Sequence, residues 1–162
     1  MTTCFFTEAF KKRLMLLFFI ILLLIALVGG IIIGSTSCYA VYGDTVYSLR
    51  AATLEGHHAF AEQFGLTLSH NPVMIQKVRI PSDFNTVYQH YNKLQQSVGL
   101  DLLPYSGKKC TLYTYQIVDP AFPEETVLHL LILNGKVIGG DISETTLTGR
   151  TSSFCQSAEL LS

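Results

Sequence analysis

Two histidines and a carboxylate occur at a spacing that could bind a metal ion. His57 and His58 are adjacent, and Glu62 follows His58 by four residues in a segment with helical periodicity. Adjacent side chains on a helix diverge by about 100°, whereas residues four apart share a face, so His58 and Glu62 could ligate one ion together. A site would need a further ligand, and the sequence contains no CxxC or HExxH motif. We therefore expect a solvated helix face, with no metal site and no cofactor.

Cys110 and His129 are the residues that could serve a small hydrolase. A cysteine nucleophile needs a base within hydrogen-bond reach, and nothing in the sequence brings Cys110 close to a histidine. His129 lies in a strongly apolar segment, where a histidine is usually hydrogen-bonded in a core or lines a groove. The nucleophile motif GxSxG is absent. The sequence favours a non-catalytic protein, with a hydrolase that uses Cys110 or His129 as an alternative.

A pair of glycines followed by an aspartate stands out in a predicted strand. Glycine in a strand interior usually marks a bulge or the close approach of another backbone, so Gly139 and Gly140 predict an element packed tightly against this strand. The functional alternative is an open groove beside the strand, with Asp141 at its rim.

Four tyrosines form the last group of candidates. Two lie on one stripe of a predicted helix and two on one face of a predicted strand, so we expect this helix to pack on that strand. Core packing is the ordinary interpretation, but tyrosines whose hydroxyls emerge at an edge combine a large area with a polar group and suit recognition. The candidate binding residues are therefore Tyr88, Tyr91, Tyr113, Tyr115, His129, Gly139, Gly140 and Asp141.

Two helices and four strands are needed to position these residues. Thr53 is a suitable N-cap for a helix over 54–64 that Gly65 ends. Ser82 is a suitable N-cap for a second helix that ends before Gly99, because apolar residues recur every three or four positions between them. The strands are expected at 73–80, 109–118, 126–133 and 136–142, with a type I′ turn at Asn134.

This order of elements predicts an α+β fold. A helix, a strand, a second helix and three further strands are typical of an antiparallel sheet that carries its helices together. We expect a small two-layer domain, with an antiparallel sheet of about four strands and both helices on one face.

An uncharged apolar segment precedes this domain. Residues 14–33 contain 18 apolar residues and two glycines. A helix of this length spans about 30 Å, which is the thickness of the hydrocarbon core of a bilayer. Lys11, Lys12 and Arg13 adjoin its N-terminal end, so the positive-inside rule places the N-terminus in the cytoplasm and the remainder outside. We predict a single-pass transmembrane signal-anchor helix in a cell membrane.

Two other export routes and one covalent link stay open. A signal peptidase could cleave after Ala40, although the apolar segment is longer than a usual signal peptide. Cys38 could carry a lipid, although Ser35 stands where a lipoprotein would have an aliphatic residue. In an oxidising compartment, Cys110 and Cys155 could form a disulfide.

The sequence divides into five parts on this basis. From residue 40 onward there are 8 basic and 11 acidic residues, a balance near −3 that argues against nucleic acid as a partner. The expected parts are a cytoplasmic N-terminus at 1–13, the transmembrane helix at 14–33, a linker at 34–50, the extracytoplasmic domain at 51–143 and a polar tail at 144–162.

Several short motifs, in order, resemble one known family. They are SLRAAT at 48–53, FG at 64–65, IPSDF at 80–84, YNKLQ at 91–95, GLDL at 99–102, YTY at 113–115 and GKVIGGDI at 135–142. This pattern resembles the domain of unknown function 4830 family of small membrane-anchored proteins from Gram-positive bacteria. The resemblance implies an extracytoplasmic location and brings no activity with it.

Three functions are consistent with these features. The favoured one is a membrane-anchored binding or regulatory module of the cell envelope, which contacts an envelope protein or a peptide. The first alternative is a structural envelope component that associates with itself. The second alternative is the hydrolase based on Cys110 or His129.

Overall fold

The computed structural model describes residues 15–16, 18–21, 38–146 and 149–154. The chain divides into two compact units, Met1–Ser37 and Cys38–Ser162. In the first unit the described residues are helical and their apolar side chains are exposed. Most of the predicted transmembrane segment at 14–33 lies outside the described residues. Within the described ranges, no helix has both the length and the apolar character that a membrane crossing requires.

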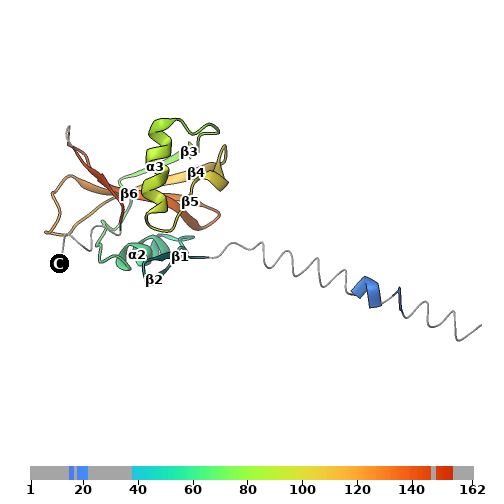
Figure 1. Ribbon diagram of the computed structural model, residues 1–162. Helices are drawn as coiled ribbons and strands as arrows, with labels where there is room; N and C mark the ends of the chain where they lie inside the picture. Colours follow the sequence, from blue (N-terminus) through green and yellow to red (C-terminus); the bar gives the residue numbers. More distant parts are fainter. Residues whose placement is uncertain (1–14, 17, 22–37, 147–148, 155–162) are drawn as a thin grey trace, which may run out of the picture. The chain divides into compact units, whose positions relative to one another are not determined.

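The second unit is built on a five-stranded antiparallel sheet, in which neighbouring strands follow one another along the chain (Figure 1). The strands are β3 (Met74–Arg79), β4 (Lys109–Gln116), β5 (Thr126–Leu133), β6 (Lys136–Glu144) and β7 (Thr151–Ser152). Asn134 and Gly135 join β5 to β6 with φ values of 53° and 72°, as the predicted type I′ turn requires. The predicted antiparallel α+β class is confirmed, with five strands in this sheet instead of about four.

Two α-helices pack on the sheet. The first begins at its predicted N-cap, and the second does not. α2 (Leu54–Glu62) begins at the predicted N-cap, where the Thr53 hydroxyl accepts a hydrogen bond from the Gly56 amide at 3.2 Å. α3 (Thr86–Gln96) begins later than predicted, because Asn85 is its N-cap in place of Ser82. The Ser106 hydroxyl donates to the Ser82 carbonyl and holds that segment outside the helix.

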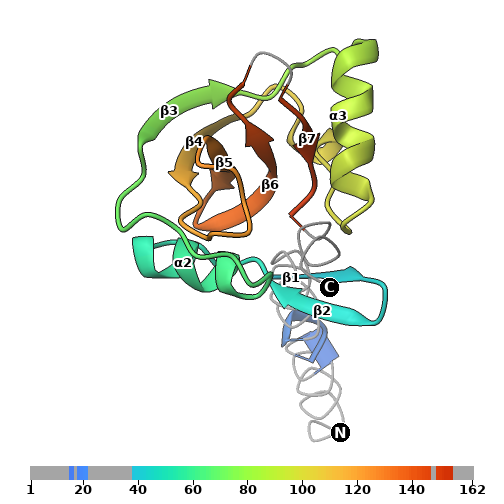
Figure 2. The ribbon, with the colours of Figure 1, turned by 90° about the vertical axis from the view of Figure 1, so that its left-hand side faces the viewer.

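The two helices pack on opposite faces of the sheet, so the prediction of two layers with both helices on one face was wrong. Side chains alternate along a strand, and the consecutive residues Leu130 and Leu131 belong to different cores. The first core contains Phe60 of α2, and the second includes Tyr88 and Tyr91 of α3 at its edge. Figure 2 shows α2 and α3 on separate sides of the curved sheet.

A hairpin occupies much of the segment predicted as a linker. β1 (Tyr39–Tyr42) and β2 (Thr45–Ser48) pair with each other, and the side chains of Tyr47 and Leu49 are 2% exposed within the first core. The Tyr47 hydroxyl donates to the Val98 carbonyl, which ties the hairpin to the end of α3. The linker prediction for 34–50 was therefore wrong for the hairpin, whose inward-facing side chains belong to the domain.

The predicted polar tail at 144–162 also contributes to the domain. Residues 151–152 form β7 and pair with β6, and Phe154 is fully buried against Phe60 and Phe64. Residues 155–162 lie outside the described part of the chain. The domain therefore extends past the predicted boundary at 143.

Candidate functional site

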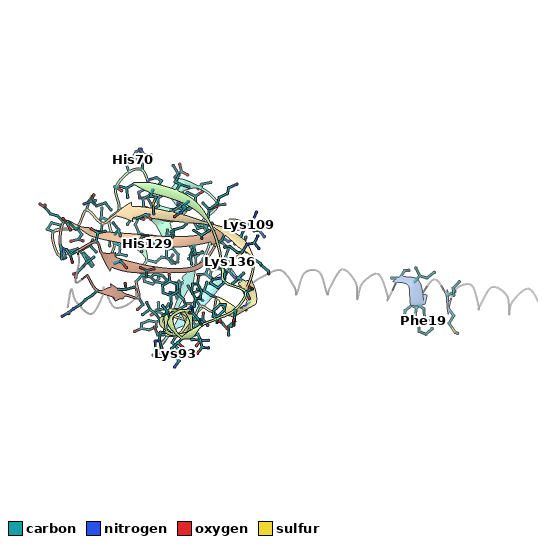
Figure 3. The ribbon with its side chains drawn as sticks, turned by 90° about the horizontal axis from the view of Figure 1, so that it is seen from above. Phe19, His70, Lys93, Lys109, His129 and Lys136 are labelled. Atoms are coloured by element: carbon teal, nitrogen blue, oxygen red, sulfur yellow. The ribbon has the colours of Figure 1, made fainter. Side chains whose placement is uncertain are left out.

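A row of three polar side chains crosses the middle of the sheet on the α3 side. Thr114 of β4 pairs with His129 of β5, and His129 pairs with Asp141 of β6. The Thr114 hydroxyl and Nδ1 of His129 are 3.0 Å apart and hydrogen-bonded. We call Thr114, His129 and Asp141 the polar row. His129 is half-buried, so part of its side chain stays accessible, and Figure 3 labels it in the middle of the sheet.

Two hydroxyl groups hold the carboxylate of Asp141. Tyr91 of α3 donates to Oδ1 at 2.7 Å, and Ser143 donates to Oδ2 at 2.7 Å. Burial and the neighbouring Asp141 charge both raise the pKa of Tyr91, so its phenol stays protonated and acts as a donor. Asp141 is only 6% exposed. The carboxylate is thus fixed in position at the boundary between α3 and the open part of the sheet.

Gly139 allows α3 to approach β6 closely. A Cβ atom at Gly139 would lie 2.9 Å from Leu102 Cδ2 and 3.2 Å from Gln95 Oε1. The amide of Gly140 donates to Gln95 Oε1 at 2.9 Å, so the side chain of the helix bonds directly to the strand backbone. This is the close approach that glycines in a strand interior indicate.

The eight residues predicted as a binding surface divide between the two faces of the sheet. Tyr88, Tyr91, His129, Gly139 and Asp141 are on the α3 side or at its boundary. In contrast, the two strand tyrosines pack toward α2.

The expected packing of the second helix on Tyr113 and Tyr115 was therefore wrong. The ring of Tyr113 lies 4.5 Å from the ring of His57, and the hydroxyl of Tyr115 is 2.7 Å from His57 Nδ1. A Cβ atom at Gly140 would point toward Phe154, on the α2 side of the sheet. The α3 side therefore carries five of the eight predicted binding residues and neither of the strand tyrosines.

His57 is a buried residue that sequence reasoning assigned to a solvated face. It is 2% exposed, and burial lowers the pKa of its imidazole below the ordinary value. Burial also raises the pKa of Tyr115 to about 12, so its hydroxyl stays protonated beside His57. The signal was present in the helical spacing of His57 with Phe60 and Ala61, which are core residues.

Cys110 and His129 lie too far apart to act together as a thiol–imidazole pair. Its side chain is buried in the second core, and burial raises the pKa of its thiol, which disfavours the reactive thiolate. Thr114, the partner of His129, follows Cys110 by four residues on β4, a separation of about 13 Å along a strand. Cys155 lies outside the described residues, so its disulfide with Cys110 stays a prediction.

A shallow groove on the outer side of α2 contains the residues considered for a metal site. Its volume is about 310 Å³, and it is lined by Leu54, Glu55, His58, Ala59, Glu62 and His70. Nε2 of His58 hydrogen-bonds to the backbone oxygen of His70 at 3.2 Å. Among the residues that the structure describes, no group of three or more histidines, cysteines or carboxylates is arranged to hold a metal ion.

The polar row is the best candidate for recognition. It offers the half-buried imidazole of His129, which can donate or accept, beside the buried carboxylate of Asp141, whose two oxygens accept from Tyr91 and Ser143. Thr114 was not predicted, because its position beside His129 depends on the register of two strands. Ser143 follows Asp141 by two residues on the same face of β6, so strand alternation could have indicated it.

Comparisons with known proteins identify a family and nothing beyond it. No curated protein and no solved structure matched the chain. One family model, described as "Domain of unknown function (DUF4830)", matches residues 60–142, which include β3, α3, β4, β5 and most of β6. Since this match covers half of the chain, the protein belongs to the DUF4830 family.

Proposed function

We propose that this protein is a single-pass membrane protein whose extracytoplasmic domain is a non-catalytic binding or regulatory module of the bacterial cell envelope. The polar row is its recognition surface. The observation that carries this proposal is the fixed carboxylate of Asp141 beside the accessible imidazole of His129, with Cys110 held apart from both.

The membrane part of the proposal rests on residues 14–33. They contain no charged residue, and three basic residues adjoin them at 11–13. The described side chains of this segment, such as Phe18 and Phe19, are apolar and exposed in a helical backbone. Exposed apolar side chains on a helix are stabilised by hydrocarbon and destabilised by water.

The binding part of the proposal rests on the contrast between the two sheet faces. The α2 side is closed by Phe60, Leu66 and the hairpin, whereas the α3 side carries polar groups next to the helix. A small molecule or an extended peptide with hydrogen-bonding groups could pair with His129 and Asp141. Nucleic acid is not an expected partner, because the domain is acidic overall.

Membrane topology is tested first, with alkaline phosphatase, which is active only after export. The enzyme is fused after Ser162 in the full chain and in a variant that lacks 14–33. We expect activity from the first fusion and none from the second. An inactive full-chain fusion, with the phosphatase retained in the cytoplasm as in the truncated variant, would contradict the proposed orientation.

Recognition is tested by photo-crosslinking from two adjacent positions on β3. Gln76 and Lys77 are both exposed, and they lie on opposite faces of the strand. A photoreactive residue at Gln76 should capture a specific envelope component in cells, and this product should be lost on His129→Ala. The same residue at Lys77 is the matched control.

The outcomes separate the three functions. Capture of a second copy of the chain from both positions would favour the structural alternative. Equal capture from Gln76 and Lys77, unaffected by His129→Ala, would contradict the polar row as the recognition surface.

A further inference from the structure

Basic residues collect at one end of the sheet. Arg79 ends β3 and pairs with Lys109 at the start of β4, and Lys136 begins β6 at the same end. Arg50 forms an isolated bridge with Lys136. Together these positions contain five of the eight basic residues that follow residue 40: Arg50, Arg79, Lys108, Lys109 and Lys136. We call this set the basic end.

Most side chains of the basic end are exposed, and Lys136 is half-buried. Arg79 donates to the carbonyl of Gly107 at 2.6 Å, and the Lys108 ammonium lies 5.4 Å from the ring centre of Tyr105. Arg79, Lys108 and Lys109 are exposed. Two acidic residues lie near this end: Asp83 on the loop after β3 and Glu55 in the first turn of α2. They reduce the excess of positive charge but do not cancel it.

Acidic residues collect at the opposite end of the sheet. Asp119, Glu124 and Glu125 lie on the loop from β4 to β5, and Glu144 ends β6 beside Thr126. Arg150 is close to Glu144 and offsets one of these charges. Strands of eight residues separate the two ends by about 25 Å. The sheet therefore has an excess of positive charge at one end and an excess of negative charge at the other.

The chain enters the domain at the basic end. The Cys38 carbonyl accepts a hydrogen bond from the Leu49 amide, and the Leu49 carbonyl accepts one from the Val137 amide, next to Lys136. Cys38 comes five positions after the last apolar residue of 14–33, a distance of at most about 18 Å. Figure 3 shows Lys109 and Lys136 together at this end, with Lys93 apart on α3.

We propose that the basic end docks on the anionic lipid headgroups of the membrane that holds residues 14–33. This inference rests on the membrane anchor proposed above and adds the orientation of the domain. Basic side chains within a Debye length of an anionic surface are attracted to it, and the acidic end is repelled. The docked domain presents the polar row about 17 Å above the headgroups, because Thr114 follows Lys109 by five residues on β4.

The test measures lysine reactivity in the full-length chain. The protein is incorporated into nanodiscs of phosphatidylcholine alone or of phosphatidylcholine with phosphatidylglycerol. Acetylation of each lysine is followed by mass spectrometry. In the anionic discs we expect acetylation of Lys108, Lys109 and Lys136 to slow by at least about threefold, and to recover in high salt. Lys93 is the internal control and should react equally in both discs.

A pair of charge-reversal variants separates docking from general attraction. Lys108→Glu with Lys109→Glu should abolish the protection of Lys136, whereas Lys77→Glu with Lys93→Glu should preserve it. Circular dichroism verifies that each variant is folded. The comparison of the wild-type protein in the two kinds of disc does not depend on the variants.

Two results would overturn the proposal in distinguishable ways. Equal acetylation of the three lysines in both kinds of disc, from a chain that co-elutes with the discs, would overturn the docking and keep the anchor. A chain that co-elutes with neither kind of disc would overturn the anchor, and the docking with it.

Discussion

The hydroxyl of Tyr91 on α3 donates a 2.7 Å hydrogen bond to the carboxylate of Asp141 on β6, fifty residues along the chain. The bond joins the helix to the sheet at the boundary of the polar row. Because Asp141 is buried, the strength of this contact bears on both stability and recognition.

Tyr91→Phe should destabilise the domain, because it removes one of the two donors to a buried carboxylate. We expect the free energy of unfolding to fall by about 1–3 kcal/mol, as measured by urea denaturation. Tyr88→Phe is the matched control on the same helix, and should cost less because the hydroxyls that donate to the Asp141 carboxylate are those of Tyr91 and Ser143. Equal losses in the two variants would contradict the role assigned to the bond.

The two glycines of β6 should differ in their tolerance of alanine. A Cβ at Gly139 meets a flexible atom of Leu102, whereas a Cβ at Gly140 would overlap the backbone oxygen of His129. We expect Gly140→Ala to cost about 3 kcal/mol and Gly139→Ala about 1 kcal/mol of unfolding free energy. Thermal unfolding of both variants measures the difference, and the reverse order would contradict the observed packing.

Local signals in the sequence predicted the elements well. Thr53 as an N-cap, the turn at Asn134 and the limits of β5 all depend on neighbouring residues, and each agrees with the structure. The predicted start of α3 was too early, because Ser82 and Asn85 are both good N-caps. The hydrogen bond from Ser106 to the Ser82 carbonyl keeps Ser82 outside the helix, so Asn85 is the cap.

Long-range relationships could not be predicted in the same way. β4 has apolar or aromatic residues on both faces, so periodicity alone did not reveal that α2 covers Tyr115 while α3 covers Cys110. The hairpin and β7 were missed because each is short, and their burial depends on contacts of Tyr47 and Phe154 with α2. The polar row likewise depends on strand register.

The segment after β6 should be required for folding. Phe154 is fully buried, and its ring centre lies 5.3 Å from that of Phe60 and 5.0 Å from that of Phe64. Phe154→Ala should lower the free energy of unfolding by about 3–5 kcal/mol. Urea denaturation measures this loss, with Val87→Ala on the exposed side of α3 as the control. A loss below about 1 kcal/mol would show that the tail is dispensable.

Cys110 should be unreactive in the folded protein. Burial both blocks access and raises the pKa of the thiol, so less thiolate is present at a given pH. We expect iodoacetamide to alkylate Cys110 at pH 8 only after urea unfolds the domain, as measured by mass spectrometry of the Cys110 peptide. Rapid alkylation of the native protein would instead support the hydrolase alternative.

The buried pair His57 and Tyr115 should make stability depend on pH. Burial lowers the pKa of His57 in the folded state below the ordinary value of 6.5. As pH falls through 6.5, the unfolded chain therefore binds a proton before the folded one does, and unfolding becomes easier. The stabilising contribution of neutral His57 is complete above that pH and is lost progressively below it.

Urea denaturation between pH 8 and pH 5 checks this dependence. We expect the free energy of unfolding to decrease toward low pH in the native sequence, and His57→Gln to flatten the part of this slope that begins near pH 6.5. His58→Gln is the matched control, since the adjacent histidine is only half-buried and bonds to the His70 carbonyl near the surface. Because the two variants remove the same chemical group one position apart, an identical slope in both would show that burial of His57 is not the cause.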